Sequence, residues 1–137
     1  MVKDFEEERD RILKIAKEFG DKIRKLRVDG RNLGLREFAG KIGLSPTYLS
    51  KMERGMDPPP SPEKIMKMAR ELSCDENMLL ALAKKLPPDF KEAFTKSKVY
   101  TKKVPEFLRT ATEANLTAAD WDRLIHELKR IKSQEKK

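Results

Sequence analysis

Apolar residues recur at spacings of three and four along nearly the whole of this 137-residue chain. Such spacing places them on one face of successive α-helices, because an α-helix has 3.6 residues per turn. The alternating pattern of a half-buried β-strand is never sustained, and the β-branched residues are scattered. The sequence therefore predicts an all-α fold.

Glycine, proline and N-capping side chains divide this pattern into segments. Gly20 and Asp21 indicate that a first helix over residues 3–19 stops and a second, short helix begins. That second helix is expected to end at Asp29-Gly30, because glycine suits a left-handed C-cap. Further helices are expected over residues 35–42, 46–53, 62–72, 75–86 and 88–94.

Lysine stands at four positions between residues 96 and 103, a segment without a strong apolar stripe, which is typical of a basic linker. After this linker, Pro105 is expected to start a helix, and Thr117 with Asp120 resembles a capping box for the last helix. The predicted parts are therefore an N-terminal helical extension (1–20), a central domain (21–95) and a C-terminal helical region (104–132).

The charge balance is 31 Lys and Arg against 23 Asp and Glu, a formal net charge of +8. This excess favours a polyanionic partner, although many soluble proteins share it. The sequence contains no glycine-rich phosphate loop, no evident nucleophile with a histidine partner and no metal-ligand spacing. These absences argue against an enzyme.

A single cysteine, Cys74, and a single histidine, His126, provide neither an internal disulfide nor a usual zinc cluster. We therefore expect no metal and no cofactor, with Cys74 a small buried side chain and His126 solvated or at an interface edge. No apolar run reaches the roughly 18 residues of a membrane span, and acidic residues follow Met1. A cytoplasmic protein without membrane contact is expected.

The most informative stretch is residues 33–55, LGLREFAGKIGLSPTYLSKMERG. Ala39 is small where two helices would cross closely, and Gly43 suits the turn between them. Ser45 is a good N-cap, and Pro46 suits the first position of the second helix, where its missing N–H group costs nothing. Leu44, Leu49 and Met52 would hold the second helix against the first.

In order and spacing, this stretch resembles the helix-turn-helix of the Cro/repressor (xenobiotic-response-element) family of transcriptional regulators, over roughly residues 21–86. The resemblance implies a five-helix phage-repressor-like DNA-binding domain, here with an extra N-terminal helix and a C-terminal helical appendage. It also implies that the second helix of the pair lies in the major groove of double-stranded DNA. The implied base contacts are Pro46, Thr47, Ser50 and Lys51, and the implied phosphate contacts are Arg36, Ser45, Tyr48 and Arg54.

The resemblance further implies a buried ion pair between Arg27 and Glu53, although an extra residue lies between Arg27 and Leu33 compared with the usual spacing. The start of the first helix departs from the family pattern. Gly34 and Leu35 stand where a capping Ser or Thr and a phosphate-binding Gln are common. Arg36 or backbone amides would have to take over that phosphate contact.

The last helix carries an apolar stripe that is expected to pair with a second copy of the chain. Its members are Trp121, Leu124, Ile125, Leu128 and Ile131. A homodimer would read a near-palindromic operator, and the chain would then act as a repressor. The competing interpretation is that the stripe packs on Phe90, Phe94 and Phe107 within one monomer.

Two alternative functions stay open at this point. The same type of DNA-binding domain occurs in antitoxins that repress their own operon, which would add a toxin as partner. The order of repressor domain, linker and C-terminal helical pair is also loosely similar to repressors that a partnered metallopeptidase inactivates.

Overall fold

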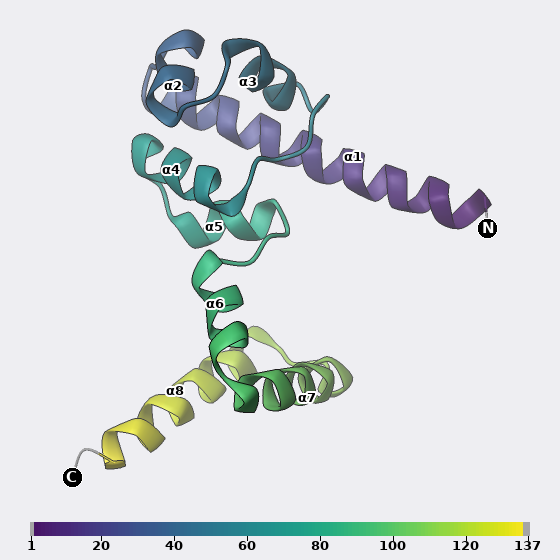
Figure 1. Cartoon of the computed structure of the whole chain (residues 1–137), viewed down its shortest axis with the longest axis vertical. Helices are drawn as coiled ribbons and strands as arrows, with labels where there is room; N and C mark the ends of the chain where they lie inside the picture. Colours follow the sequence, from purple (N-terminus) through teal and green to yellow (C-terminus); the bar gives the residue numbers. More distant parts are fainter. Residues whose placement is uncertain (1, 136–137) are drawn as a thin grey trace. The chain divides into compact units, whose positions relative to one another are not determined.

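The computed structural model describes residues 2–135, and every regular element within them is helical (Figure 1). The expected all-α fold is confirmed. The elements are α1 (Val2–Lys25), a π-helical turn η1 (Leu26–Gly30), α2 (Leu35–Ile42), α3 (Pro46–Glu53), α4 (Pro62–Leu72), α5 (Glu76–Leu82), α6 (Pro88–Lys96), α7 (Lys98–Ala114) and α8 (Ala118–Glu135). The chain forms two compact units, one up to Lys91 and one from Glu92 onward.

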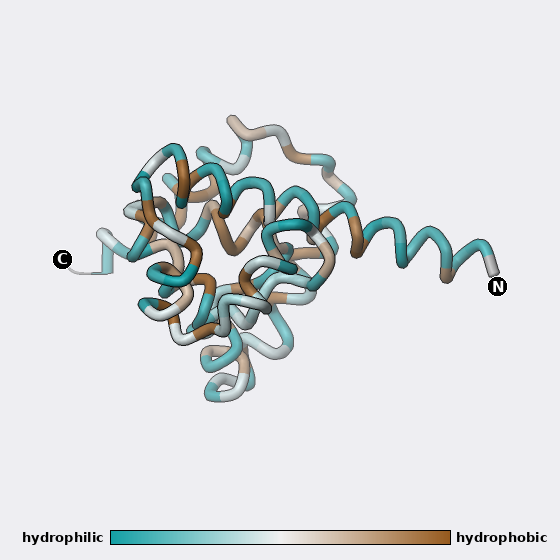
Figure 2. Tube along the Cα trace, turned by 90° about the horizontal axis from the view of Figure 1, so that it is seen from above, coloured by the Kyte–Doolittle hydropathy of each residue, from teal (hydrophilic) through white to brown (hydrophobic). Residues whose placement is uncertain are grey.

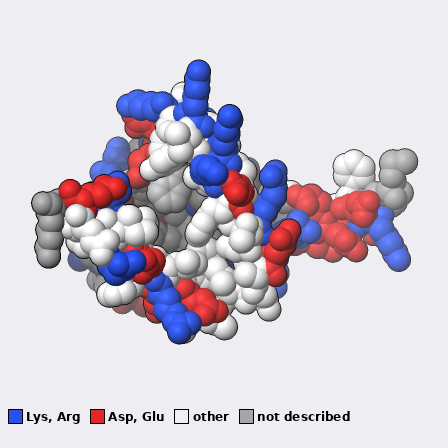
Figure 3. Space-filling view, turned by 90° about the horizontal axis from the view of Figure 1, so that it is seen from below, with Lys and Arg blue, Asp and Glu red and all other residues white. Residues whose placement is uncertain are grey.

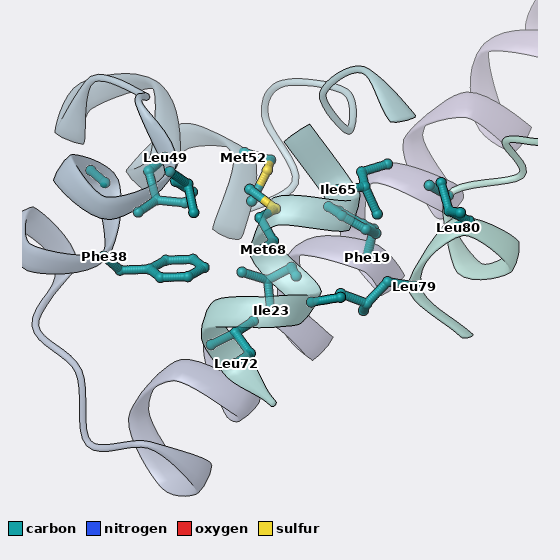
Figure 4. Close-up of a cluster of buried hydrophobic side chains, with 14 residues drawn as sticks. Phe19, Ile23, Phe38, Leu49, Met52, Ile65, Met68, Leu72, Leu79 and Leu80 are labelled. Atoms are coloured by element: carbon teal, nitrogen blue, oxygen red, sulfur yellow. The ribbon is translucent and has the colours of Figure 1, made fainter. Parts of the chain in front are cut away.

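The N-terminal unit is built around one hydrophobic core to which α1, α2, α3, α4 and α5 all contribute. Figure 4 shows the larger side chains meeting between the helices. The fully buried ones are Phe19, Ile23, Phe38, Ile42, Leu49, Met52, Ile65, Met68, Leu79 and Leu80. The five core helices expected between residues 21 and 86 are therefore present, with the first of them supplied by the second half of α1.

The expected stop at Gly20 is wrong, because α1 runs without a break from Val2 to Lys25. Gly20 lies at a close helix crossing: a Cβ atom at this position would stand 2.3 Å from the backbone oxygen of Met52. Glycine is needed here for the approach of α3. The N-terminal helix is consequently no separate extension, since Ala16, Phe19 and Ile23 belong to the buried interior.

The first half of α1 projects from the core and is exposed from Lys3 to Lys14. Figure 2 shows this projecting part as mostly hydrophilic, and Figure 3 shows acidic side chains gathered along it. Phe5 is the most exposed large apolar side chain there, at 78%. The acidic residues are Asp4, Glu6, Glu7, Glu8 and Asp10.

The segment after α1 also differs from expectation. The helix continues through η1, and the residue with a left-handed backbone is Asn32 (φ 50°) instead of Gly30. Backbone hydrogen bonds from Arg31 N–H to the Leu26 oxygen (3.1 Å) and from Leu33 N–H to the Arg27 oxygen (2.9 Å) close this end. Near the other end of the unit, α5 stops at Leu82, so the helix expected to reach Leu86 is shorter than predicted.

In the C-terminal unit, the basic linker and the helix start at Pro105 are both wrong. Ser97 caps α7 by accepting a hydrogen bond from Tyr100 N–H (3.3 Å), and Pro105 lies inside that helix. The capping box before α8 is present: Thr117 N–H donates to Asp120 Oδ2 (3.0 Å), and Asp120 N–H donates to Thr117 Oγ1 (3.2 Å).

The C-terminal unit buries little of its apolar surface. Within residues 92–135, Ala111 is the one buried residue. Phe107 and Trp121 make an edge-to-face ring contact with centroids 6.1 Å apart, which joins α7 to α8. Within residues 2–135, each helix is too short or too polar to cross a lipid bilayer.

Candidate nucleic-acid interface

The turn between α2 and α3 is set by Gly43, which has a left-handed backbone (φ 70°, ψ 35°). This conformation strains residues with a side chain and is easy for glycine. Leu44 N–H donates to the Ala39 oxygen (2.9 Å) and closes the end of α2. The chain is thereby redirected into α3, as the sequence predicts from Gly43.

The start of α3 is fixed by Ser45 and Pro46. Ser45 Oγ accepts a hydrogen bond from Tyr48 N–H (3.1 Å), and Pro46 occupies the first helical position. Because Ser45 uses an oxygen lone pair for this cap, its hydroxyl hydrogen stays available for another acceptor. The N-cap therefore leaves one donor at the exposed end of α3.

The two faces of α3 have different environments. Leu49 and Met52 are fully buried, and Glu53 is 5% exposed. On the opposite face, Pro46, Thr47 and Lys51 are exposed and Ser50 is half-buried. All four residues expected to contact bases therefore lie on one side of α3, away from the core.

The expected phosphate contacts lie near the two ends of the helix pair. Arg36 is exposed in the first turn of α2, and Arg54 is exposed just after α3. Arg54 Nε donates to the Ser50 oxygen (3.3 Å), which leaves its terminal guanidinium nitrogens for other acceptors. Arg36 forms no hydrogen bond or ion pair with any residue in the described part of the chain.

Tyr48 is half-buried, and its hydroxyl donates to the Pro58 oxygen (3.0 Å). Burial, together with the nearby negative charge of Asp57, raises the pKa of the Tyr48 phenol above its ordinary value. Its single donor hydrogen is already used, so a phosphate contact would require this bond to break. This bond could not be predicted from the sequence, because no local pattern links residues 48 and 58.

Arg27 and Glu53 form the ion pair that the resemblance implies. Arg27 Nε and Nη2 donate to the two carboxylate oxygens at 2.7 and 2.8 Å, and Nη1 donates to the Leu33 oxygen at 2.8 Å. The hydrogen bond to Glu53 raises the pKa of Arg27. The extra residue before Leu33 is accommodated by η1, because a π-turn contains one more residue than an α-turn.

A further contact at the turn was not predicted. Lys64, in the first turn of α4, donates from Nζ to the Ile42 oxygen (2.9 Å) and the Gly43 oxygen (3.4 Å). Two residues singled out by the sequence lie elsewhere. Cys74 is half-buried against the core, where burial raises the pKa of its thiol, and His126 is exposed on α8.

The arrangement of α2, the turn and α3 can be compared with known protein families. Residues 23–79 match the model of the helix-turn-helix family, and this range contains η1, α2, α3 and α4 with the turn and the exposed face of α3 just described. Residues 23–79 are similar to a helix-turn-helix domain. The resemblance to the Cro/repressor family is confirmed over this range. Domains of this type place the second helix of the pair in the major groove of DNA.

The structure is also similar to two solved ones. The clp gene regulator ClgR from Corynebacterium glutamicum is 26% identical, with a TM-score of 0.45, and the match covers 68% of this chain and 92% of that one. A complex of SinR protein and SinI protein contains a chain that is 22% identical, with a TM-score of 0.42, over 84% of this chain and 98% of that one. A search of curated protein sequences finds no match.

The first helix of the pair, α2, begins without a side-chain cap. Gly34 occupies the N-cap of α2 in an extended conformation, and its oxygen accepts from Phe38 N–H (3.0 Å). No side chain within the described residues accepts from the first amides of α2. Because Gly34 and Leu35 depart from the family pattern, these backbone N–H groups have no side-chain acceptor within residues 2–135 and can donate to another group.

Proposed function

We propose that this protein is a sequence-specific, double-stranded-DNA-binding transcriptional regulator that acts as a dimeric repressor. The observation that carries the proposal is the division of α3 into a core-bound face and an exposed polar face. A helix held in this way can enter the major groove without any change in the domain. The net charge of +8 supports a polyanionic partner.

We assign base readout to the exposed face of α3. Thr47 can meet a thymine methyl group or a base-edge acceptor, and Lys51 can donate to guanine O6 and N7. Lys51 forms no ion pair with any residue between 2 and 135, so its ammonium group is available. Ser50 can donate or accept at a base edge, whereas Pro46 offers only apolar contact.

We assign phosphate contacts to Arg36, Ser45 and Arg54, whose donors remain open. The uncapped amides of α2 add N–H groups at the same end as Arg36. Tyr48 is a weaker candidate than the sequence suggests, because its hydroxyl donates to Pro58. The projecting half of α1 carries five acidic and four basic side chains between residues 3 and 14, so it offers no net positive charge to the DNA backbone.

We assign dimerisation to the apolar stripe of α8. Its five members, Trp121, Leu124, Ile125, Leu128 and Ile131, are between 38% and 60% exposed. Within the C-terminal unit, Phe107 contacts Trp121, and Phe94 is 36% exposed. Packing within the C-terminal unit thus leaves most of the stripe uncovered, and a second copy would bury it.

The test is to select duplexes from a randomised DNA pool with the full-length chain. A dimer with two-fold symmetry should enrich a near-palindrome whose half-sites are about one helical turn, or roughly 34 Å, apart. The selected duplex should bind at least about a thousandfold more tightly than an unrelated duplex of the same length. A pool that shows no enriched sequence would contradict sequence-specific binding, and an enriched single half-site would contradict the dimer.

The repressor role needs a separate measurement. With the selected duplex placed over a promoter, expression of the chain should lower reporter transcription, because the bound protein would exclude the polymerase. The variant Lys51→Ala, which removes a proposed base contact, serves as the control and should repress less. A reporter that rises instead would make the chain an activator.

A further inference from the structure

Lys64 belongs to α4 and contacts the turn between α2 and α3. Its Nζ reaches back from α4 to the oxygens of Ile42 and Gly43, at 2.9 and 3.4 Å. These oxygens lie at the C-terminal end of α2, where backbone carbonyls have no partner within the helix. The partial negative charge of that helix end favours an ammonium group there.

The fit around Lys64 is close. A Cβ atom on Gly43 would stand 2.8 Å from Lys64 Nζ, so the ammonium group lies directly against the left-handed residue that redirects the chain. The ion pair between α2 and α4 joins Lys41 to Glu71 at 3.8 Å, between side chains that are 46% and 36% exposed. Lys64 is therefore the closest polar link between α4 and the turn.

We propose that Lys64 is a positioning residue for DNA recognition, which fixes the orientation of α3 by holding the turn and does not itself contact phosphate. Its ammonium group donates to two carbonyl oxygens of the turn, and its side chain is half-buried. Loss of this link would let α3 change its angle to α2, and the exposed face of α3 would then miss the base edges. The proposal rests on the DNA-binding function proposed above.

The test compares Lys64→Met with Lys67→Met in the full-length chain. Lys67 is exposed on the same helix, so its substitution removes the same charge without touching the turn. Binding is measured over a salt series to the duplex that the wild-type chain selects and to an unrelated duplex. Lys64→Met should lower the preference for the selected duplex by about tenfold, the effect of losing one hydrogen bond of a charged donor.

The salt dependence separates positioning from direct contact. If Lys64 only positions α3, the slope of log affinity against log salt for Lys64→Met should equal that of Lys67→Met. A slope shallower by about one than that of Lys67→Met would show a lost phosphate contact and overturn the proposal. An unchanged preference in a variant shown to be folded by its thermal melt would also overturn it. Lys64→Arg, which keeps the charge and donors, should recover part of the preference.

Amide hydrogen exchange gives a readout without DNA. The Leu44 N–H group, bonded to the Ala39 oxygen across the turn, should exchange about tenfold faster in Lys64→Met than in Lys67→Met. Exchange of Leu49 N–H within α3 reports whether the whole domain has loosened instead. If the wild-type chain selects no duplex, the DNA-binding function fails while this exchange test still decides whether Lys64 holds the turn.

Discussion

At the scale of single residues, two glycines in helices should respond in opposite ways to alanine. Gly20→Ala should destabilise the chain by about 1–3 kcal/mol, because the added methyl group would meet backbone atoms of α3 that cannot rotate away. Gly40→Ala in α2 should stabilise it by about 0.5–1 kcal/mol, since no atom lies within 4 Å of its Cβ position and alanine favours helix.

Urea unfolding of the two variants and the wild type measures both effects. The comparison is controlled internally, because the two substitutions are chemically identical and both lie inside helices. A Gly20→Ala variant at least as stable as the wild type would show that α1 does not approach α3 as closely as described.

Removing one partner of the Arg27–Glu53 ion pair should strongly lower the free energy of unfolding. Glu53→Gln leaves the buried guanidinium without its counter-charge and should destabilise the chain by about 3–5 kcal/mol. Glu76→Gln breaks the exposed pair with Arg70 and should cost less than about 1 kcal/mol. Unfolding free energies at neutral pH check this, and equal losses in the two variants would contradict a special role for the buried pair.

At the scale of a single element, α3, the variants Lys51→Ala and Arg54→Ala should differ in their effects on DNA binding. Lys51→Ala should reduce discrimination at one base pair by about 1–3 kcal/mol, because it removes a donor to a base edge. Arg54→Ala should weaken binding to all sequences alike and make the salt slope shallower by about one. Isotherms on the selected duplex and its single-base variants measure both, and uniform losses in both variants would contradict base readout by Lys51.

Helix boundaries were predictable where the signals were local. The bounds of α2 and α3 agree with the sequence, because Gly43, Ser45 and Pro46 act on their immediate neighbours. The boundary at Gly20 was not predictable, since the reason for that glycine is the backbone of α3, more than thirty residues later. Both Ser97 and Pro105 are residues that can start a helix, and in the structure Ser97 is the N-cap of α7.

The candidate site was predictable to a similar extent. The exposed face of α3 follows from helical spacing once Leu49 and Met52 are assigned to the core. The bonds from Lys64 to the turn and from Tyr48 to Pro58 join side chains to backbone oxygens of other elements. Residue type and spacing carry no signal for such bonds, because any carbonyl can accept.

At the scale of the whole molecule, dimerisation through α8 can be tested without truncating the chain. The double substitution of Leu124 and Leu128 by lysine should convert a dimer to a monomer, because charged groups would replace the centre of the apolar stripe. Operator affinity should then fall towards the non-specific level, since one recognition helix reads too few base pairs.

Asp122→Lys is the matched control, because Asp122 is exposed on α8 and lies outside the stripe. It should remain dimeric in sedimentation velocity at tens of micromolar protein. A wild-type chain that sediments as a monomer at that concentration, or a double variant that stays dimeric, would show that the stripe does not join two copies.

The two-sided character of α3 also bears on how such a protein can diverge. Its buried residues Leu49, Met52 and Glu53 are constrained by packing in the interior. The exposed residues Pro46, Thr47 and Lys51 have no such packing to preserve. Substitutions on the exposed face can therefore accumulate without a loss of folded protein. After gene duplication, copies of this domain could acquire different DNA preferences while keeping an unchanged interior, and a designer could vary the same few positions in a library.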